Sequence, residues 1–333
     1  MRNTVITLAR RPEGMVNDSD FSIQEQPLSV LTDGQVRVEV HYISLDPAMR
    51  GWMNAGTTYI KGVEIGATMR AFAAGRVLES RHPDFAVNDY VTGLIGAQRF
   101  ATVPGKYLTK VPANDQNLSK FLGVLGMPGM TAYFGMLDRG QPREGDSVFI
   151  SGAAGIVGST AGQIAKLKGC RVVGTAGTAA KCHFLTERCG FDAAINYKEE
   201  DVKTQLRAHC PEGLHVFYDN VGGPTLDHGL ANLARGARVV ICGAISQYNN
   251  RAMYGPTNYM KIVTARATMT GIIVFDFQER YPEAVQRISA WLASGQLVTK
   301  EDVVNGIERF SEALRMLYTG ENFGKLLLRV QGN

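Results

Sequence analysis

A glycine-rich turn, SGAAGIVGS at residues 151–159, is the stretch whose composition points most directly to chemistry. It follows a short apolar run and precedes a helix-like stretch at 157–168. Gly155 and Gly158 allow backbone amides to approach a pyrophosphate and the helix to pack on its strand, although Ala153 replaces the first glycine of the usual G-x-G-x-x-G pattern. The turn therefore predicts a dinucleotide site rather than only a tight bend. The expected contacts in it are Ala154, Gly155, Ile156, Val157 and Gly158.

The segment VVGTAGTAAK, at residues 172–181, indicates which dinucleotide binds. An NAD site ordinarily has Asp or Glu at the end of the second strand, where it accepts a hydrogen bond from the ribose 2′-hydroxyl. No acidic residue precedes Lys181 in this segment, and its small residues leave room for a 2′-phosphate that Lys181 can pair with. We therefore expect NADP(H), with Gly177 and Lys181 among its contacts. The alternative is that Lys181 is an ordinary solvated helix residue.

Cysteine and histidine are not spaced as they are in metal sites or disulfide frameworks. The five cysteines are an odd number without C-x-x-C spacing, and all lie between residues 170 and 242. The six histidines show neither H-E-x-x-H nor another paired-ligand spacing. We therefore expect no metal and no disulfides, with Cys182 and Cys189 packed as inert thiols.

Two regions of different secondary structure must position these residues. Residues 4–120 contain short alternating or β-branched runs between turn residues, which is typical of an antiparallel β-rich domain. From about residue 146, strand-like and helix-like stretches alternate, which predicts a parallel, doubly wound α/β sheet. The expected strands are 147–150, 171–174, 193–197, 215–218 and 238–242, and the expected helices are 178–189, 200–209, 224–234, 258–265 and 279–294.

The remaining elements suggest how the domains divide. The apolar run 272–275 is expected to extend the parallel sheet. The last forty residues contain an amphipathic helix and a strand at 325–330, with too little apolar surface to stand alone, so they are expected to return to the first domain. We therefore predict a β-rich domain of residues 1–122 and 300–333 and a dinucleotide-binding domain of residues 123–299.

Composition excludes several classes of protein. The 333 residues are 45% hydrophobic and 20% charged, with a formal net charge of +4. The basic residues are scattered, so no nucleic-acid partner is expected. No run approaches the roughly 20 apolar residues of a membrane span, and no apolar segment of signal-peptide length follows Arg10-Arg11. We expect a soluble, cytoplasmic protein with a small-molecule substrate and no membrane partner.

Six longer motifs carry a resemblance to a known family. They are ISLDPAMRG (43–51), LGMPGMTAYFGMLD (125–138), AAGIVGSTAGQIAKLKGCRVVG (153–174), FYDNVGG (217–223), ICGAISQYN (241–249) and ENFGKLLLRV (321–330). With them the chain resembles, nearly end to end, the zinc-independent medium-chain dehydrogenases/reductases. It is most similar to the group of prostaglandin reductase (leukotriene B4 12-hydroxydehydrogenase), plant alkenal double-bond reductases and bacterial curcumin reductase. The resemblance implies a Rossmann domain and a β-rich, GroES-like catalytic domain.

The resemblance also implies a reaction. The wider superfamily has a zinc-binding cysteine in the first motif and a Gly-His-Glu motif after it, where this chain has Ser44-Leu-Asp-Pro47 and Glu64-Ile-Gly66. A Lewis-acid alcohol dehydrogenase is therefore disfavoured. NADPH-dependent reduction of the C=C bond of α,β-unsaturated aldehydes or ketones, including curcumin- or prostaglandin-type enones, fits better. In that reaction hydride goes to the β-carbon and only an enolate oxygen needs stabilising.

By resemblance, Tyr248 of SQYN is the catalytic group that donates a hydrogen bond or proton to the enolate, because a phenol can donate at neutral pH without a permanent charge. For the family, the nicotinamide ribose hydroxyl is proposed to share this role with the tyrosine. Tyr59 of TTYIKG is the second expected pocket aromatic. Simple packing is the alternative for both tyrosines. The further cofactor contacts that the resemblance implies are Met127, Tyr197, Asn220, Cys242, Gly243, Ala244, Ile245, Ser246, Tyr248, Ile272, Val274, Phe275 and Asn322.

Two stretches depart from the family pattern. ATMRAFAAG (67–75) replaces the usual glycine-rich G-x-M-x-G-G stretch and loop 249–257 lacks a proline run, which puts substrate size in doubt. The group is commonly dimeric, and the apolar run 272–275 is a candidate edge for a sheet that continues across a two-fold axis. A monomer with that edge covered is the alternative. A quinone oxidoreductase and a non-catalytic NADPH-binding protein remain alternative functions.

Overall fold

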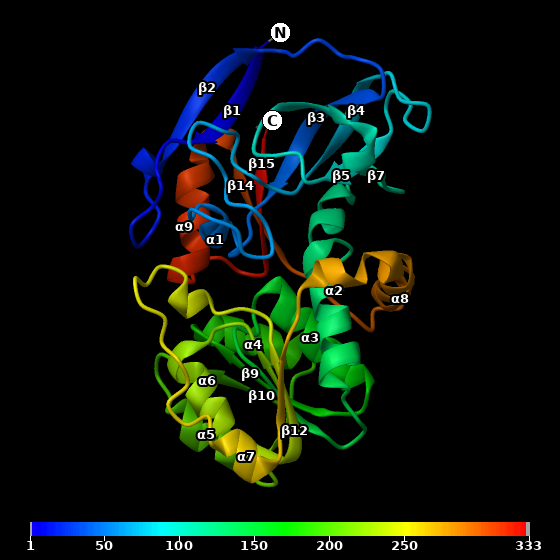
Figure 1. Cartoon of the computed structure of the whole chain (residues 1–333). Coiled ribbons are helices and arrows are strands. Elements are labelled where there is room, and N and C mark those ends of the chain that lie inside the picture. Colours follow the sequence, from blue (N-terminus) through cyan, green and yellow to red (C-terminus); the bar gives the residue numbers. More distant parts are fainter. Residues whose placement is uncertain (1, 331–333) are drawn as a thin grey trace. The chain divides into compact units, whose positions relative to one another are not determined.

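The computed structural model describes residues 2–330 (Figure 1). Contacts within the chain divide it into two compact units. The first unit contains residues up to 123 together with those from 301 onward, and the second contains residues 124–300. The first is built mainly of strands and the second alternates strands and helices, which confirms the predicted fold class. No helix in the described part of the chain has both the length and the apolar character needed to cross a membrane.

The first unit contains two sheets. Strands β1 (Arg2–Leu8) and β2 (Phe21–Pro27) form an antiparallel pair. The larger sheet has the order β14-β15-β3-β4-β5-β7, and β6 also pairs with β3. Its strands are β3 (Gln35–Ser44), β4 (Ala73–Ser80), β5 (Tyr90–Gly93), β6 (Phe100–Pro104), β7 (Leu108–Lys110), β14 (Glu301–Asn305) and β15 (Lys325–Arg329). The helices are α1 (Met49–Trp52) and α9 (Phe310–Thr319).

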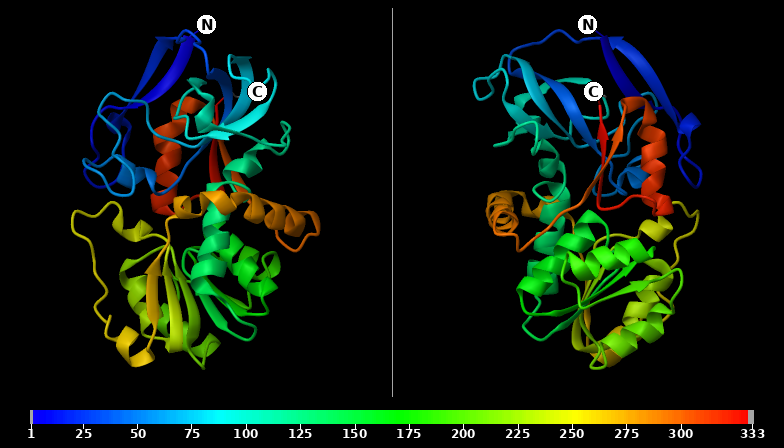
Figure 2. Two further views of the ribbon diagram at one scale, coloured as in Figure 1. Left: turned by 45° about the vertical axis from the view of Figure 1, so that its right-hand side comes forward. Right: turned by 180° about the vertical axis from the view of Figure 1, so that it is seen from behind.

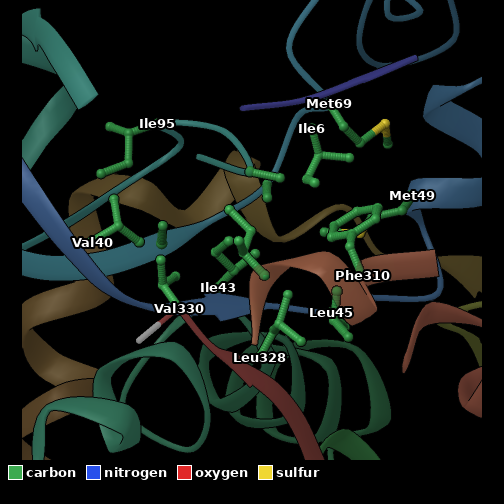
Figure 3. Packing of buried hydrophobic residues seen from close by; sticks show 14 of the residues in the cluster. Ile6, Val40, Ile43, Leu45, Met49, Met69, Ile95, Phe310, Leu328 and Val330 are labelled. Atoms are coloured by element: carbon green, nitrogen blue, oxygen red, sulfur yellow. The ribbon is translucent and has the colours of Figure 1, made fainter. Parts of the chain in front are cut away.

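Hydrophobic periodicity explains the core of the first unit. Val36, Val38 and Val40 alternate along β3 and are fully buried, because every second residue of a strand points to the same face. On α9, Phe310, Ala313, Leu314 and Leu317 are buried at the spacing that places them on one helix face. Figure 3 shows Phe310 packed among residues of this core that include Ile43, Leu45, Met49 and Leu328.

The second unit is a parallel sheet with helices between successive strands (Figures 1 and 2). Its six strands, counted within the described residues, have the order β10-β9-β8-β11-β12-β13. They are β8 (Ser147–Ile150), β9 (Arg171–Ala176), β10 (Ala193–Asn196), β11 (Leu214–Asp219), β12 (Leu233–Ile241) and β13 (Thr268–Gly271). The α-helices are α2 (Met127–Phe134), α3 (Ile156–Leu167), α4 (Ala179–Glu187), α5 (Val202–His209), α6 (Gly223–Leu230), α7 (Lys261–Ala265) and α8 (Tyr281–Ala293). All four residues of β8 are buried, as expected for a central strand covered on both faces.

The last sheet strand differs from the expectation. The sequence predicted that the apolar run 272–275 extends the sheet, but β13 ends at Gly271 and a 3₁₀ helix starts at Val274. Ile272 and Val274 are buried outside any strand. A short apolar run marks burial, and its periodicity alone does not distinguish a strand from another buried segment. Strand β12 also begins at Leu233, five residues before the predicted start at 238.

Candidate active site

Most of the expected cofactor contacts follow the carboxyl ends of strands in the second unit. The glycine turn follows β8, Gly177 follows β9, Tyr197 follows β10, Asn220 follows β11 and segment 242–248 follows β12. Because these strands are parallel, their carboxyl ends meet at one edge of the sheet. The strand order reverses between the neighbours β8 and β11. Ligands of doubly wound sheets bind at such a switch point.

Side chains join the ends of β8 and β11 at the switch point. Ser151 Oγ donates to Asp219 Oδ1 over 2.6 Å and accepts from the backbone N–H of Asn220 over 2.8 Å. The side-chain amide of Asn220 donates in return to the carbonyl oxygen of Ser151 over 2.8 Å. Ser151 and Asp219 are both fully buried. Asn220, an expected cofactor contact, is therefore held by reciprocal bonds to the neighbouring strand end.

The carboxylate of Asp219 organises the loop that follows β11. Besides Ser151, it accepts from the backbone N–H groups of Val221 and Gly222, each over 3.0 Å. Burial raises the pKa of Asp219, and these hydrogen bonds oppose the rise because they favour the ionised form. Gly222 and Gly223 have φ values of +69° and +57°, a conformation that favours glycine. The DNVGG sequence thus specifies a tight loop around one buried carboxylate.

In the glycine turn, Ala153 stands where the usual motif has its first glycine, and the structure shows how the alanine fits. Gly152, one residue before the position held by Ala153, has a φ of +58°. The backbone N–H of Ala153 donates to Thr175 of β9 over 2.8 Å. A Cβ on Gly174 would lie 2.6 Å from the Ala153 Cβ, so glycine at 174 makes room for the alanine. Ala153 is therefore accommodated by a second glycine on the neighbouring strand.

The same turn fits a pyrophosphate. A Cβ on Gly158 would lie 2.6 Å from the carbonyl oxygen of Gly152, so a side chain there would displace the turn. A Cβ on Gly155 would meet only that carbonyl oxygen, at 3.5 Å, which leaves space above the turn. Helix α3 begins at Ile156, and the amides of its first turn have no partner within the helix. These amides and the helix dipole favour an anion at this position.

The loop after β9 is suited to a second phosphate. Helix α4 begins after Thr178, whose hydroxyl accepts from the backbone N–H of Lys181 over 3.3 Å, and its first turn has no acidic residue. Lys181 is 9% exposed, so it is not the ordinary solvated helix residue of the alternative interpretation. A Cβ on Gly177 would lie 2.8 Å from the hydroxyl of Tyr197, which places that ring beside the loop. Gly177, Lys181 and Tyr197 are thus gathered around the ends of β9 and β10.

Segment 242–248, after β12, is bonded to the loop after β11. The amides of Cys242 and Gly243 donate to the carbonyl oxygen of Asp219, over 2.8 and 3.2 Å. The amide of Ile245 donates to the carbonyl oxygen of Asn220 over 3.2 Å. Ser246 donates to Val221 from both its amide and its hydroxyl. The structure therefore brings Asn220 and segment 242–248 together.

The side chain of Tyr248 is hydrogen-bonded to the backbone of its own segment. Its phenolic oxygen accepts from the backbone N–H of Ala244 over 3.1 Å. A Cβ on Gly243 would approach the same oxygen to 3.0 Å, so glycine there allows the close approach. The bond from Ala244 uses an oxygen lone pair and not the phenolic proton. Tyr248 can therefore act as a hydrogen-bond donor from a position fixed by the backbone.

Met127 is the first residue of α2, whose first turn is linked to the sheet through Thr131. Tyr218 OH donates to the carbonyl oxygen of Thr131 over 2.9 Å, and Thr131 Oγ1 donates to that of Met127 over 2.8 Å.

Burial raises the pKa of the Cys242 thiol to about 11, so this thiol is protonated at neutral pH. All five cysteines are free, and no cluster of three potential His, Cys, Asp or Glu ligands occurs in residues 2–330.

The remaining expected contacts lie elsewhere. Ile272 and Val274 follow β13 and are buried, with exposures of 5% and 7%, whereas Phe275 is partly exposed. Tyr59 and Asn322 belong to the first unit. The indole Nε1 of Trp52 donates to Tyr59 OH over 2.9 Å, which orients a ring that is 48% exposed. The Asn322 amide donates to its own loop at Gly324.

The segment where the wider superfamily has a zinc-binding cysteine contains a buried ion pair. Lys325 Nζ donates to Asp46 Oδ1 over 2.8 Å and to the carbonyl oxygen of Leu45 over 2.9 Å. Ser44 Oγ donates to the other oxygen of Asp46. Both charged side chains are almost fully buried. An ion-paired carboxylate and a hydroxyl do not match the Cys and His ligands of a zinc site.

Sequence reasoning overlooked three residues that build the site, Ser151, Gly152 and Asp219. Two signals were available in the sequence. Gly152 is a further glycine within the turn. Ser151 directly follows the buried strand β8, and Asp219 is the last residue of the buried strand β11. Their importance depends on β8 and β11 being neighbours, although 68 residues separate Ser151 from Asp219.

Comparison with known proteins agrees with this architecture. Residues 4–111 match the family described as the N-terminal domain of oxidoreductases, and residues 157–290 match the zinc-binding dehydrogenase family. The NADPH-dependent curcumin reductase of Escherichia coli K12 is 39% identical, over 100% of this chain and 98% of that protein. The NADP⁺-dependent 2-alkenal reductase of Nicotiana tabacum is 36% identical, over 98% of this chain and 97% of that protein.

A solved structure extends the agreement to the backbone. CurA of Vibrio vulnificus in complex with NADPH matches with a TM-score of 0.94 and 36% identity, over 99% of this chain and 100% of that one. These similarities cover both units, and the chain has an ion pair instead of zinc ligands at the first motif. The chain therefore belongs to the zinc-independent medium-chain dehydrogenase/reductase family, in the group that contains the curcumin and 2-alkenal reductases.

Proposed function

We propose that this protein reduces the C=C bond of α,β-unsaturated aldehydes and ketones with NADPH. The observation that carries the proposal is the joined pair of loops at the switch point, where the segment with Tyr248 is bonded to the DNVGG loop. Full-length relatives named as an NADPH-dependent curcumin reductase and a 2-alkenal reductase support it. The buried Lys325–Asp46 pair supports a reaction that needs no zinc.

The proposed cofactor site follows from the fit described above. The amides of the α3 first turn, with Gly155 and Gly158 leaving space, would hold the pyrophosphate. Lys181 and the N-terminus of α4 would favour a 2′-phosphate over a bare hydroxyl. The names of the relatives also specify NADPH or NADP⁺. When bound, NADPH supplies the hydride that the β-carbon accepts.

The chain's own contribution to the chemistry is to stabilise negative charge on the substrate oxygen. Hydride addition to the β-carbon leaves an enolate, and a donor fixed in advance lowers the energy of that charge most effectively. We assign this role to Tyr248, because the Ala244 N–H fixes the position of its phenolic oxygen by donating to a lone pair of it. Tyr59, held by Trp52, is the proposed aromatic wall of the substrate pocket.

The test is where a deuterium label arrives. With a 2-alkenal and NADPH deuterated at the transferred position, we expect the label at the β-carbon of a saturated aldehyde. Tyr248→Phe should lower kcat by about 10- to 1,000-fold while the Kd for NADPH changes little, because one preorganised donor is lost. A ribose hydroxyl or water can replace part of that donor, which explains the low end of the range.

Other outcomes separate the alternatives. Label at the carbinol carbon of an allylic alcohol would mean carbonyl reduction and would refute the proposal. Faster turnover of a quinone than of any enal or enone would favour a quinone oxidoreductase. Binding of NADPH without turnover of any of these substrates would favour a non-catalytic protein.

We further propose a homodimer formed through β13. This strand is the last in its sheet and pairs with β12 on one side, and Met269 and Ile273 near it are 40% and 36% exposed. An edge of this kind can extend a sheet across a two-fold axis. The division into a catalytic unit and a dinucleotide-binding unit, and a cytoplasmic location, also remain proposals.

A further inference from the structure

Asp227 on helix α6 accepts hydrogen bonds from a loop of the same unit. Its Oδ2 accepts from Tyr254 OH over 2.8 Å and from Thr257 Oγ1 over 2.5 Å. Its Oδ1 accepts from the backbone N–H of Thr257 over 3.0 Å, and its carbonyl oxygen accepts from the Asn258 side chain over 2.8 Å. One acidic residue therefore holds three residues of the loop. We call residues 249–258 the Asp227-anchored loop.

Helix α6 is a fixed support for these bonds. Leu226 and Leu230 are buried, and a Cβ on Gly229 would lie 2.1 Å from the ring of Phe217 in β11, so helix and strand are in close contact. Burial raises the pKa of Asp227, but the hydrogen bonds from the loop outweigh burial and lower it overall. The carboxylate is therefore ionised at neutral pH, and hydrogen bonds to an ionised group are stronger than neutral ones.

Tyr254 connects this anchor to Tyr248. While the hydroxyl of Tyr254 donates to Asp227, its backbone N–H donates to Gln247 Oε1 over 3.0 Å. The side chain of Asn250 donates to the same oxygen over 3.3 Å. Gln247 is 5% exposed and directly precedes Tyr248. A series of hydrogen bonds thus runs from α6 through Tyr254 to the residue beside Tyr248.

The loop has few other means of holding its conformation. Prolines restrict φ and so reduce the entropy that a loop loses on ordering, but this loop lacks the proline run of the family pattern. Met253 is 72% exposed and Tyr254 is 41% exposed. Segments with few buried contacts are the ones that open most easily. The bonds to Asp227 therefore provide order that a proline run would otherwise provide.

We propose that Asp227 is a positioning residue for the reduction, which fixes the Asp227-anchored loop and through it the phenol of Tyr248. This rests on the function proposed above, and Asp227 acts through Tyr248 and not on the substrate itself. A preorganised donor stabilises the developing charge only when it is held at the right position. The bonds of segment 242–246 to the loop after β11 do not involve Asp227, so NADPH binding should not depend on it.

The test compares the effect of Asp227→Ala in two backgrounds. With a 2-alkenal and saturating NADPH, we expect kcat to fall by about 3- to 30-fold, because displacing a reacting group by about 1 Å costs up to about 100-fold. The Kd for NADPH should change by less than about twofold. In a protein that already carries Tyr248→Phe, Asp227→Ala should lower kcat by less than about twofold further, because the donor that it positions is gone.

Two milder variants keep the test independent of a folding defect. Asp227→Asn keeps an oxygen for the Thr257 N–H and has an amide that can donate to both hydroxyls, so its kcat should lie between those of the natural protein and Asp227→Ala. Tyr254→Phe loses its hydroxyl bond to Asp227 but keeps its backbone bond to Gln247, and its kcat should also be intermediate. Thermal unfolding checks that every variant is folded.

Asp201→Ala is the matched control. Asp201 also accepts from both the backbone N–H and the hydroxyl of one threonine, Thr204, at the start of α5. Its removal takes away the same kinds of bond from another part of the unit. This variant should leave kcat and the Kd for NADPH unchanged.

Four results would overturn the proposal. They are an unchanged kcat in Asp227→Ala, a loss in the Tyr248→Phe background as large as in the natural one, a rise in the Kd for NADPH that accounts for the whole effect, and an equal loss in Asp201→Ala.

The proposed function can fail separately, if the natural protein reduces no enal or enone or if Tyr248→Phe keeps full activity. Hydrogen exchange then decides the role of Asp227 without turnover. The N–H of Ala244, which donates to Tyr248 OH, and the N–H of Tyr254 should exchange faster in Asp227→Ala than in the natural protein. Exchange of the Ala244 N–H at the natural rate would show that Asp227 does not position Tyr248.

Discussion

The most informative perturbation of the switch point is Ser151→Ala. Ser151 Oγ donates to a fully buried carboxylate and accepts from the Asn220 N–H. A hydrogen bond to a charged group contributes about 1.5–3 kcal/mol, and leaving a buried N–H unsatisfied costs about 1–3 kcal/mol. Because the two terms are not fully additive, we expect the free energy of unfolding to fall by about 2–5 kcal/mol. That is a large part of the roughly 5–15 kcal/mol of a typical domain.

The same change should weaken cofactor binding. Asn220 is held by Ser151 through its backbone amide and through its side chain. Alanine at position 151 keeps the carbonyl oxygen that accepts from the Asn220 side chain, but it lacks the hydroxyl that accepts from the Asn220 backbone N–H. We therefore expect the Kd for NADPH, measured by calorimetry, to rise about tenfold or more, the equivalent of about 1.4 kcal/mol. Urea unfolding followed by fluorescence measures the change in the free energy of unfolding.

The pH dependence provides an internal check. Burial already raises the pKa of Asp219 in the folded state, and loss of the Ser151 donor should raise it further. Between the folded-state pKa of Asp219 in the natural protein and the higher pKa in the variant, the folded variant binds more protons. Its free energy of unfolding therefore falls relative to that of the natural protein as pH rises through this interval. The deficit of Ser151→Ala should therefore be larger at neutral pH than in acid.

Ser159→Ala is the control. Ser159 is also buried, at 3% exposure. Among residues 2–330, its hydroxyl makes only a long hydrogen bond of 3.4 Å, to the carbonyl oxygen of Ile156. Alanine suits a helix interior, so the free energy of unfolding should change by less than about 0.5 kcal/mol. If Ser151→Ala is as stable as this control and binds NADPH equally well, the junction between β8 and β11 does not have the role that we assign to it.

Two further predictions concern the cofactor and the assembly. Lys181→Ala should raise the KM for NADPH at least about tenfold more than the KM for NADH, because a charge-assisted contact with the 2′-phosphate is lost. Equal effects on the two cofactors in steady-state kinetics would contradict the assignment. Light scattering at micromolar concentration should give twice the 36.2 kDa chain mass, and Met269→Lys on the β13 edge should shift it toward one chain mass. A natural protein that has one chain mass would rule out the dimer.

Several features were readable from local sequence. The glycine turn, the alternation of strand-like and helix-like runs after residue 146 and the six family motifs predicted a doubly wound sheet and a β-rich unit, and the structure has both. This worked because helix and strand periodicities and glycine positions act over a few residues. The expected contacts after β8 and β9 came from the residues themselves, whereas those after β10, β11 and β12 came from the family resemblance. All of them follow strands that end at one edge of the parallel sheet.

Other features depended on strand order and packing. The sequence predicted a strand at 272–275, but the chain leaves the sheet after Gly271, because burial of Ile272 and Val274 does not require pairing. Ala153 looked like a departure from the glycine motif until Gly174 on the neighbouring strand explained the space for it.

The sequence by itself determined the class of fold and the family of this protein, because both are encoded in short motifs and in local periodicity. Only the tertiary structure showed that Ser151 meets Asp219, that Arg70 lies over Trp52 and that Lys325 pairs with Asp46. The physical reason is that these contacts join residues far apart in the chain. Their energies depend on burial and on the partner that each charge or donor finds, which strand order and loop closure decide.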